Sequence, residues 1–386
     1  MDLLQWRDRA QVTSAMGPGF DDDPKAIAAF LAATSRLQHY DEGSLTVERA
    51  LGSGTSFEVF ACRDENSGGM VAVKRPKFPH TTSKTSGLVN NTVLRELKIA
   101  AYPPLLQHQN IARVLGFENI TRVGSKYTLS LISEFSEIGS LDHFFEDTLP
   151  PSIYGWAQKF SFVTDVASGL EVLHACRIIH SDLKPENILL FRNPQNLPDT
   201  PLIAKISDFG NAIVEETLFV EDTFRRKREY RGTPMYTAPF VLDADGNIPF
   251  HVMPKADIYS FGLLAWSIFK EQHFFLSAGE KVSDENKNIS LQHTAQEILK
   301  AFRSYVQEIH SALPANERMR IERTVEACIV GPFIFDPSAP SPMVLEQTYR
   351  KAFSAASQIK KLLQSSLKAT IRYETPSALV CLIIFM

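Results

Sequence analysis

The stretch His180-Ser181-Asp182-Leu183-Lys184-Pro185-Glu186-Asn187 decides how this chain of 386 residues is interpreted. The carboxylate of Asp182 is a group that can accept a proton from a hydroxyl. The carboxamide of Asn187 stands five residues later and offers an oxygen of the kind that a hard cation such as Mg²⁺ prefers. Each residue alone is explained equally well by a cap or a turn, so the residues around them carry the argument.

A second carboxylate follows a predicted hairpin. Short strands are predicted at 188–191 and 203–207, separated by a Pro/Asn-rich insert at 193–201. Asp208-Phe209-Gly210 comes directly after the second strand, and its glycine permits an abrupt change of direction. Asp208 is therefore a second candidate ligand for a divalent cation.

Upstream of this segment the sequence predicts glycine-punctuated strands at 45–51, 59–62 and 70–73. Gly52 and Gly54 separate the first two strands, where backbone N–H groups without a neighbouring Cβ can approach a phosphate. A plain hairpin turn explains the same two glycines. Lys74 ends the third strand, and it is either a point cation for phosphate or an exposed strand end.

A glutamate stands in the apolar stripe of a predicted helix. The stripe Val93, Glu96, Leu97 and Ala100 predicts a helix over 89–101, preceded by a polar loop at 80–87. A buried carboxylate requires a cation, and a buried lysine requires a carboxylate. Glu96 is therefore the predicted partner of Lys74.

Composition excludes several classes of protein. Apolar residues make up 44%, charged residues 22%, and the formal net charge of −4 gives no reason to expect a nucleic acid partner. Four dispersed cysteines without a CxxC pair indicate neither a zinc site nor a disulfide framework, and fit a reducing compartment.

We find no signal peptide and no apolar run long enough to span a membrane, so an intracellular protein, cytoplasmic or nuclear, is expected. The apolar tail 378–386 is read as a buried strand or helix end, with a weak membrane or partner contact, or a wrongly predicted chain end, as the alternatives.

The two halves of the chain differ in predicted structure. A buried strand at 128–135 completes a strand-rich first part, whereas 156–174 and most of 255–375 are predicted to be helical. Residues 1–40 form an extension with one short helix after Asp23-Pro24. This order predicts an α+β protein with two lobes.

Taken together, these motifs resemble those of the eukaryotic protein kinase family, over about residues 44–350. Two further segments strengthen the resemblance: Gly232-Thr233-Pro234-x-Tyr236-x-Ala238-Pro239 resembles the end of an activation segment, and 257–262 the start of the buried helix of the large lobe. The resemblance implies a bilobal kinase-like fold, with a small β-rich N-lobe at 44–134 and a larger helical C-lobe at 137–350. It leaves 1–43 as an N-terminal extension and 351–386 as a C-terminal helix and apolar tail.

The resemblance also implies a role for each motif. Asp182 would orient the acceptor hydroxyl and take its proton, while Lys184 would neutralise charge on the transferred phosphoryl group. Lys74, oriented by Glu96, would hold the α- and β-phosphates of ATP. The remaining implied residues contact nucleotide or metal: Gly52 and Gly54 over the phosphates, Val59, Ala72 and Leu189 around adenine, Glu134 to Ser136 as the hinge that bonds the base, and Asn187 with Asp208 on Mg²⁺ (or Mn²⁺).

The acceptor class follows from two details of the same resemblance. Lys184 and the pair Gly232-Thr233 resemble the serine/threonine branch, and the Thr233 hydroxyl is expected to bond Asp182 and Lys184. The prediction is an ATP-dependent kinase that phosphorylates serine or threonine in protein substrates. A pseudokinase that binds nucleotide as a scaffold is the main alternative, and a small-molecule phosphotransferase is a third; the oligomeric state stays open.

The sequence departs from the family pattern at three positions. Phe57 stands at the third loop glycine, where it would stiffen the loop or fold under it and weaken nucleotide binding. Ser181 replaces the catalytic-loop arginine, so weak dependence on phosphorylation of Thr217, Thr223 or Tyr230 is expected. Phe240 replaces a glutamate whose arginine partner is itself replaced by Pro340, which fits the joint loss of a buried ion pair. The basic run 225–228 is either a solvated loop or a contact for an acidic partner.

Overall fold

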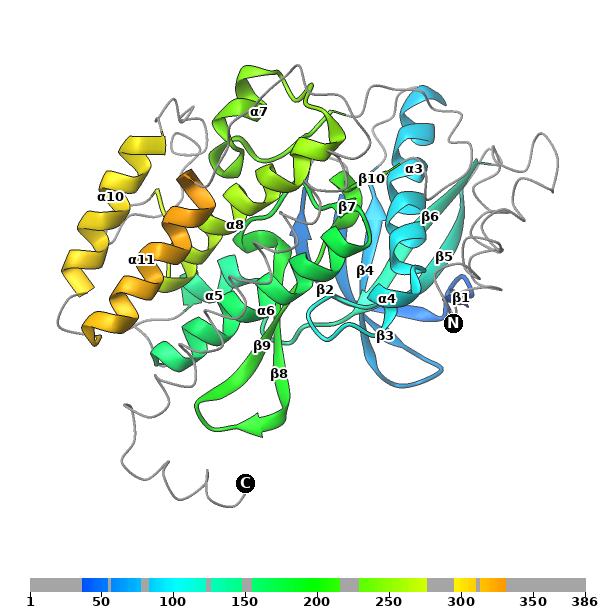
Figure 1. The fold of residues 1–386 in the computed structure, drawn as a ribbon. Coiled ribbons are helices and arrows are strands. Elements are labelled where there is room, and N and C mark those ends of the chain that lie inside the picture. The colour runs from blue at the N-terminus through cyan, green and yellow to red at the C-terminus, as the bar shows by residue number, and fades with distance from the viewer. Residues whose placement is uncertain are drawn as a thin grey trace. The chain divides into compact units, whose positions relative to one another are not determined.

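The computed structural model describes residues 37–54, 57–77, 83–122, 126–147, 155–215, 229–275, 295–309 and 313–330. The chain forms two compact units (Figure 1). The first unit comprises Met1–Glu137 and Ser207–Arg226, and the second comprises Ile138–Ile206 and Lys227–Met386. The first break in the chain therefore falls after Glu137, one residue past the predicted hinge Glu134 to Ser136.

The first unit is built on a six-stranded sheet with the order β1-β5-β6-β4-β3-β2. β1 pairs with β5 in parallel, and the other neighbours are antiparallel. The strands are β1 (Gln38–Tyr40), β2 (Leu45–Ser53), β3 (Phe57–Asp64), β4 (Met70–Pro76), β5 (Val114–Arg122) and β6 (Lys126–Glu134). The strands predicted at 45–51, 59–62, 70–73 and 128–135 are confirmed as β2, β3, β4 and β6. β1 lies within the residues expected to form an extension, yet it hydrogen-bonds into this sheet.

One long helix packs on the sheet. α3 (Ser83–Ala100) lies along β5 and β6, and α4 (Pro103–Leu106) follows it (Figure 1). Its predicted stripe is buried, with Val93 and Leu97 in one apolar cluster with Phe117. The loop predicted at 80–87 is wrong from Ser83 onward, because the helix begins there. Periodicity marks only the turns of a helix that pack on a core, and the polar stretch 83–87 carries no such signal.

The second unit is mainly helical. Its α-helices are α5 (Leu141–Asp147), α6 (Trp156–Ala175), α7 (Pro239–Asp243), α8 (Met253–Lys270), α10 (Ala295–Glu308) and α11 (Ala315–Val330). α8 packs against α6 and α11, and it is buried along almost its whole length. A helix that is apolar on all sides must lie inside a core, which explains this central position. The prediction of helices at 156–174 and in the described part of 255–375 is confirmed.

A hairpin projects from the second unit (Figure 1). β8 (Ile188–Leu197) and β9 (Thr200–Ile206) pair as far as Leu197 and Thr200, so the insert predicted at 193–201 is wrong as a separate loop. The Asn193 side chain donates to Thr200 O at 2.8 Å and accepts from Gln195 N at 3.0 Å. These bonds bridge an irregular pairing after Arg192 and let polar residues extend the two strands.

Several predictions fall outside the described residues: the helix after Asp23-Pro24, the basic run 225–228, Thr217, Thr223, Pro340 and the tail 378–386. The exchange of an ion pair for Phe240 and Pro340 therefore stays a prediction. Within the described ranges, Cys62, Cys176 and Cys328 are buried free thiols. Among the helices in those ranges, none combines the length and the hydropathy of a membrane-spanning segment.

Candidate active site

Strand register places the lysine of the first unit. β3 aligns Val59 with Lys74 on one side and with Gly52 on the other, so these three residues form a row across the sheet. Lys74 Nζ donates to Glu96 Oε1 at 2.7 Å and to Asp208 Oδ1 at 2.7 Å. The predicted Lys74–Glu96 pair is therefore confirmed, and its carboxylate is almost fully buried.

The electrostatics of this triad follow from burial and charge. Burial raises the pKa of Glu96 to about 7, although the Lys74 ammonium acts against that change. Burial disfavours the Lys74 ammonium too, but the two carboxylates outweigh it and raise the pKa of Lys74 above its usual value. The lysine is thus held as a permanent cation.

Asp208 stands at a sharp turn before the short helix η3 (Phe209–Asn211). Its backbone is left-handed, with a φ of 60°, and its Oδ1 accepts from Gly210 N at 3.2 Å. A side chain at Gly210 would be crowded, because a Cβ there would lie 3.1 Å from Thr92 Cγ2 and 3.2 Å from Glu96 Oε1. The Asp208 side chain remains 45% exposed, so its carboxylate is accessible to a ligand.

The two loop glycines are not required by packing. A Cβ on Gly52 would meet no atom within 4 Å, and one on Gly54 would meet only Phe57 O at 3.9 Å. Phe57 turns inward instead: its ring packs against the apolar cluster beneath α3, and its centroid lies 4.9 Å from Lys74 Nζ. Of the two outcomes expected for Phe57, folding under the loop is the one observed.

The catalytic segment lies in the second unit and is bonded to the end of the activation segment. Asp182 Oδ1 accepts from Thr233 N at 2.9 Å and from Thr233 Oγ1 at 2.7 Å. Lys184 Nζ donates to Thr233 Oγ1 at 2.8 Å, so the expected bonds of the Thr233 hydroxyl are confirmed. Asn187 ends the short helix η2 (Pro185–Asn187). Its Nδ2 donates to Asp182 O at 2.7 Å, and this bond orients the carboxamide.

A buried carboxylate organises the residues before Asp182. Asp257, at the start of α8, is fully buried and accepts from the backbone N–H groups of His180 at 2.8 Å and Ser181 at 2.9 Å. It also contacts His174 Nε2 at 3.0 Å and accepts from the Tyr230 hydroxyl at 3.0 Å. Sequence reasoning did not single out Tyr230 for this contact; the available signal was a charged residue in an otherwise apolar helix, which needs buried donors.

The other predicted nucleotide contacts are described within their own units. Ala72 of β4 pairs with Ser133 of β6. Ala72 precedes Lys74 by two residues, so the two side chains lie on the same face of the sheet. Glu134 Oε1 accepts from Arg113 N at 2.7 Å, and Ser136 is buried. Leu189 pairs with Lys205 in the β8–β9 ladder and forms a bridge with Ser140.

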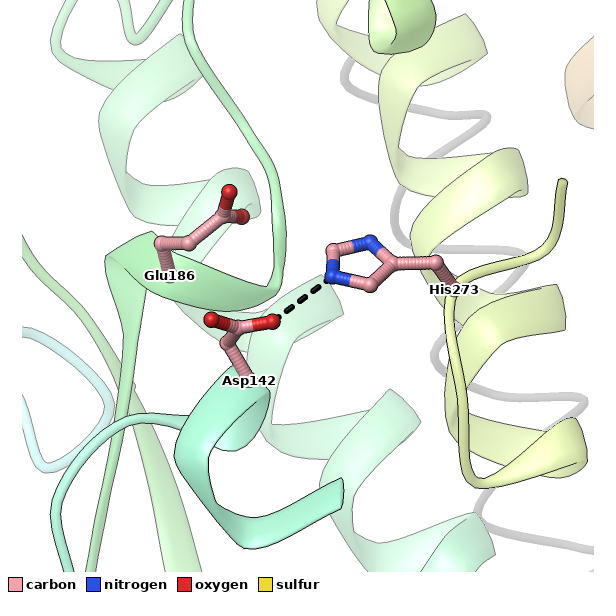
Figure 2. Close-up of side chains that lie close together, drawn as sticks. All are labelled: Asp142, Glu186 and His273. Carbon is pink, nitrogen blue, oxygen red and sulfur yellow. Dashed lines mark hydrogen bonds and ion pairs between the residues drawn. The ribbon is translucent and has the colours of Figure 1, made fainter. Parts of the chain in front are cut away.

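Figure 2 shows a further group of polar side chains beside η2, in the second unit. Ligand atoms of Asp142, Glu186 and His273 lie within 4.8 Å of one another. The imidazole of His273 is bonded at both nitrogens, by Asp142 Oδ1 at 2.6 Å and by the Tyr236 hydroxyl at 2.9 Å. These bonds tie α5 to η5 (Pro234–Tyr236), so a structural link accounts for the buried histidine.

The comparison with known families decides what these motifs represent. The protein kinase domain family matches residues 45–372, which is most of the chain. The chain belongs to the protein kinase family. The kinase match extends past residue 350, where the sequence placed the end of the domain, and it agrees with the α+β fold of a β-rich unit and a helical unit.

Proteins of Arabidopsis thaliana and Dictyostelium discoideum are among the curated relatives of this kinase. Cysteine-rich receptor-like protein kinase 7 of Arabidopsis thaliana is 29% identical over 266 residues, covering 67% of this chain and 35% of the relative. A LEAF RUST 10 disease-resistance locus receptor-like kinase (like 2.5) of the same plant is 34% identical over 47% of the chain and 24% of the relative. The probable serine/threonine-protein kinase drkC of Dictyostelium discoideum is 28% identical over 66% of the chain and 30% of its own length. The chain thus spans about a quarter to a third of the length of these three relatives. Because several relatives are named receptor-like, an intracellular location stays a prediction.

Proposed function

We propose that this kinase is catalytically active and transfers the γ-phosphoryl group of ATP to serine or threonine hydroxyls of protein substrates. The observation that carries the proposal is the bonding of Asp182. Thr233 occupies Oδ1 through two hydrogen bonds, while Oδ2 lies 3.4 Å from Asn187 Nδ2 and 3.5 Å from Lys184 Nζ. A carboxylate fixed in this way is oriented to receive a hydroxyl proton, and Lys184 is placed to offset negative charge.

The residues of the first unit fit the phosphates of ATP. The open space at Gly52 and Gly54 is what a close approach of backbone to phosphate needs, and Lys74 is a fixed cation beside it. The proposed adenine contacts are Val59, Ala72 and Leu189, with Glu134 and Ser136 bonding the base through their backbone.

The donor set also fits a divalent cation. The carboxylate of Asp208 and the carboxamide oxygen of Asn187 are hard oxygen ligands, as Mg²⁺ or Mn²⁺ requires. When bound, the cation would neutralise charge on the phosphates. The serine/threonine preference is supported by the Lys184–Thr233 bond and by a relative named as a probable serine/threonine kinase.

One observation favours a second candidate, a pseudokinase that binds nucleotide with little transfer. The ring centroid of Phe57 lies 4.9 Å from Lys74 Nζ, so the ring lies beside the cation that a phosphate would contact. Against this candidate stands the presence of the functional groups that phosphoryl transfer needs, at Lys74, Asp182, Lys184, Asn187 and Asp208.

The test uses the full chain, γ-labelled ATP, Mg²⁺ or Mn²⁺ and a general protein substrate. We expect label on serine and threonine after acid hydrolysis, and none with Asp182→Asn, which removes the proton acceptor but keeps the side-chain shape. A thermal shift with ATP should persist in Asp182→Asn and vanish in Asp208→Ala. A shift without any transfer by the unmodified chain would favour the pseudokinase and end the proposal.

A further inference from the structure

Tyr230 joins the end of the activation segment to the core of the second unit. Its side chain is only 3% exposed, and its hydroxyl donates to Asp257 Oδ1 at 3.0 Å. The same oxygen accepts from Ser181 N at 2.9 Å, directly before Asp182 in the chain. One carboxylate oxygen therefore holds both the catalytic segment and the activation segment.

The backbone around Tyr230 is held as closely as its side chain. Tyr230 N donates to Gly246 O at 3.0 Å, and Gly246 has a φ of +74° with space for no side chain: its Cβ would lie 2.7 Å from Tyr230 O. Two residues later, a Cβ on Gly232 would lie 2.7 Å from Ser181 O. Residues 230–232 are thus closely packed between Gly246 and the catalytic segment.

We propose that Tyr230 is a positioning residue for phosphoryl transfer, which fixes Thr233 against Asp182 through its bond to Asp257. The inference rests on the proposed kinase function. Asp182 follows Ser181, and Thr233 lies three residues after Tyr230, so the Asp182–Thr233 bonds close a short loop of structure anchored at Asp257. Without the phenol, Thr233 would keep its bonds to Asp182 and Lys184 but lose the buried anchor that sets their orientation.

The chemistry of the contact suits a permanent anchor. Burial and the Asp257 carboxylate both raise the pKa of Tyr230 well above its usual value, so the phenol remains a donor. The bond requires no phosphate, and it lies beside Ser181, where the family pattern has the arginine that would receive one. Tyr230 is also too buried to serve as a phosphorylation site in this conformation. A test of activation-loop phosphorylation should therefore substitute Thr217 and Thr223 and leave Tyr230 in place.

The experiment compares Tyr230→Phe with Tyr305→Phe in the full chain. Both variants keep the ring and remove one buried hydroxyl bond, since the Tyr305 hydroxyl donates to Phe269 O at 2.7 Å elsewhere in the same unit. We expect Tyr230→Phe to lower kcat about tenfold with the KM for ATP unchanged, and Tyr305→Phe to leave kcat within about twofold at a similar shift of the unfolding midpoint. Equal kcat values for the two variants would overturn the inference.

A second measurement does not depend on activity. Amide hydrogen exchange in the peptides that contain Ser181 and Thr233 should become faster in Tyr230→Phe and stay unchanged in Tyr305→Phe. If the unmodified chain transfers no phosphate, the proposed function fails and this exchange experiment alone decides the anchor. Unchanged exchange at Thr233 in Tyr230→Phe would overturn it.

Discussion

Phe57 is the residue at which the site departs most from an open phosphate loop. Its ring centroid lies 4.9 Å from Lys74 Nζ, and such a cation–π contact contributes about 0.5–2 kcal/mol. We propose that the ring competes with nucleotide for this lysine. We therefore predict that Phe57→Gly binds Mg²⁺·ATP up to about tenfold more tightly, as measured by titration calorimetry.

The control for this prediction is Phe60→Leu. Phe60 lies on the same strand as Phe57, and its ring contacts another cation, the Arg75 guanidinium, 5.7 Å from the ring centroid. Its substitution should leave the dissociation constant for ATP unchanged. Equal or weaker ATP binding by Phe57→Gly would show that the ring does not compete with the nucleotide.

Glu96 predicts a pH dependence of activity. Because its pKa is raised to about 7, lowering the pH through 7 protonates it, and a neutral carboxyl no longer pairs with Lys74. We expect kcat/KM for ATP to fall by about tenfold from pH 8 to pH 6. Glu96→Gln should be slow and nearly flat over this range, and comparison with it removes the titration of ATP itself.

The same shift fixes the sign for stability. Glu96 has a higher pKa in the folded chain than its usual 4.5, so the folded state binds more protons between pH 4.5 and about 7. Its contribution to the free energy of unfolding is therefore lost as the pH rises through that window.

The activity prediction has its own contrary outcome. A pH profile of kcat/KM parallel to that of Glu96→Gln would contradict its assignment to the Glu96 carboxyl.

At the scale of elements, sequence patterns predicted the parts of helices and strands that pack on the core, and they missed the polar residues that lengthen those elements. The stripe Val93 to Ala100 revealed the inner turns of α3, and the polar start at Ser83 gave no signal. The hairpin β8–β9 was shortened in prediction because Pro and Asn usually end strands, whereas here Asn193 bridges the irregular pairing. β1 is three residues long and depends on pairing with β5, a contact distant in sequence that local patterns cannot show.

The site was more predictable than the fold because charged groups in apolar surroundings need partners. That rule led from Glu96 to Lys74, and the motif spacing led to the Thr233 bonds. The same rule was not applied to Asp257, whose four contacts come from three separate segments: the end of α6, the catalytic segment and Tyr230. Phe57 could be identified as a departure, but its inward orientation depends on the apolar cluster beneath α3.

At the scale of the whole molecule, each of the two units contains at least one buried thiol, so unfolding of each unit can be followed separately. Cys62 lies in β3 of the first unit, and Cys176 and Cys328 lie in the second. Burial raises the pKa of Cys176 and Cys328 to about 12 and that of Cys62 above its usual value, so the reactive thiolate is suppressed as well as shielded. Labelling by a maleimide should therefore report unfolding of the unit that contains each cysteine.

Nucleotide should protect Cys62 in this assay. Gly52, Lys74 and Asp208 all belong to the first unit, so Mg²⁺·ATP at a hundred times its dissociation constant should stabilise that unit by about 2.7 kcal/mol. We expect the urea midpoint for Cys62 labelling, identified by peptide mass, to rise with Mg²⁺·ATP and to remain unchanged in Asp208→Ala. The urea midpoint for Cys176 labelling should shift with that for Cys62 only if the two units unfold together. Comparing the two midpoints therefore measures how cooperatively the units unfold. An unshifted Cys62 midpoint at saturating Mg²⁺·ATP would place the nucleotide elsewhere than on Gly52, Lys74 and Asp208.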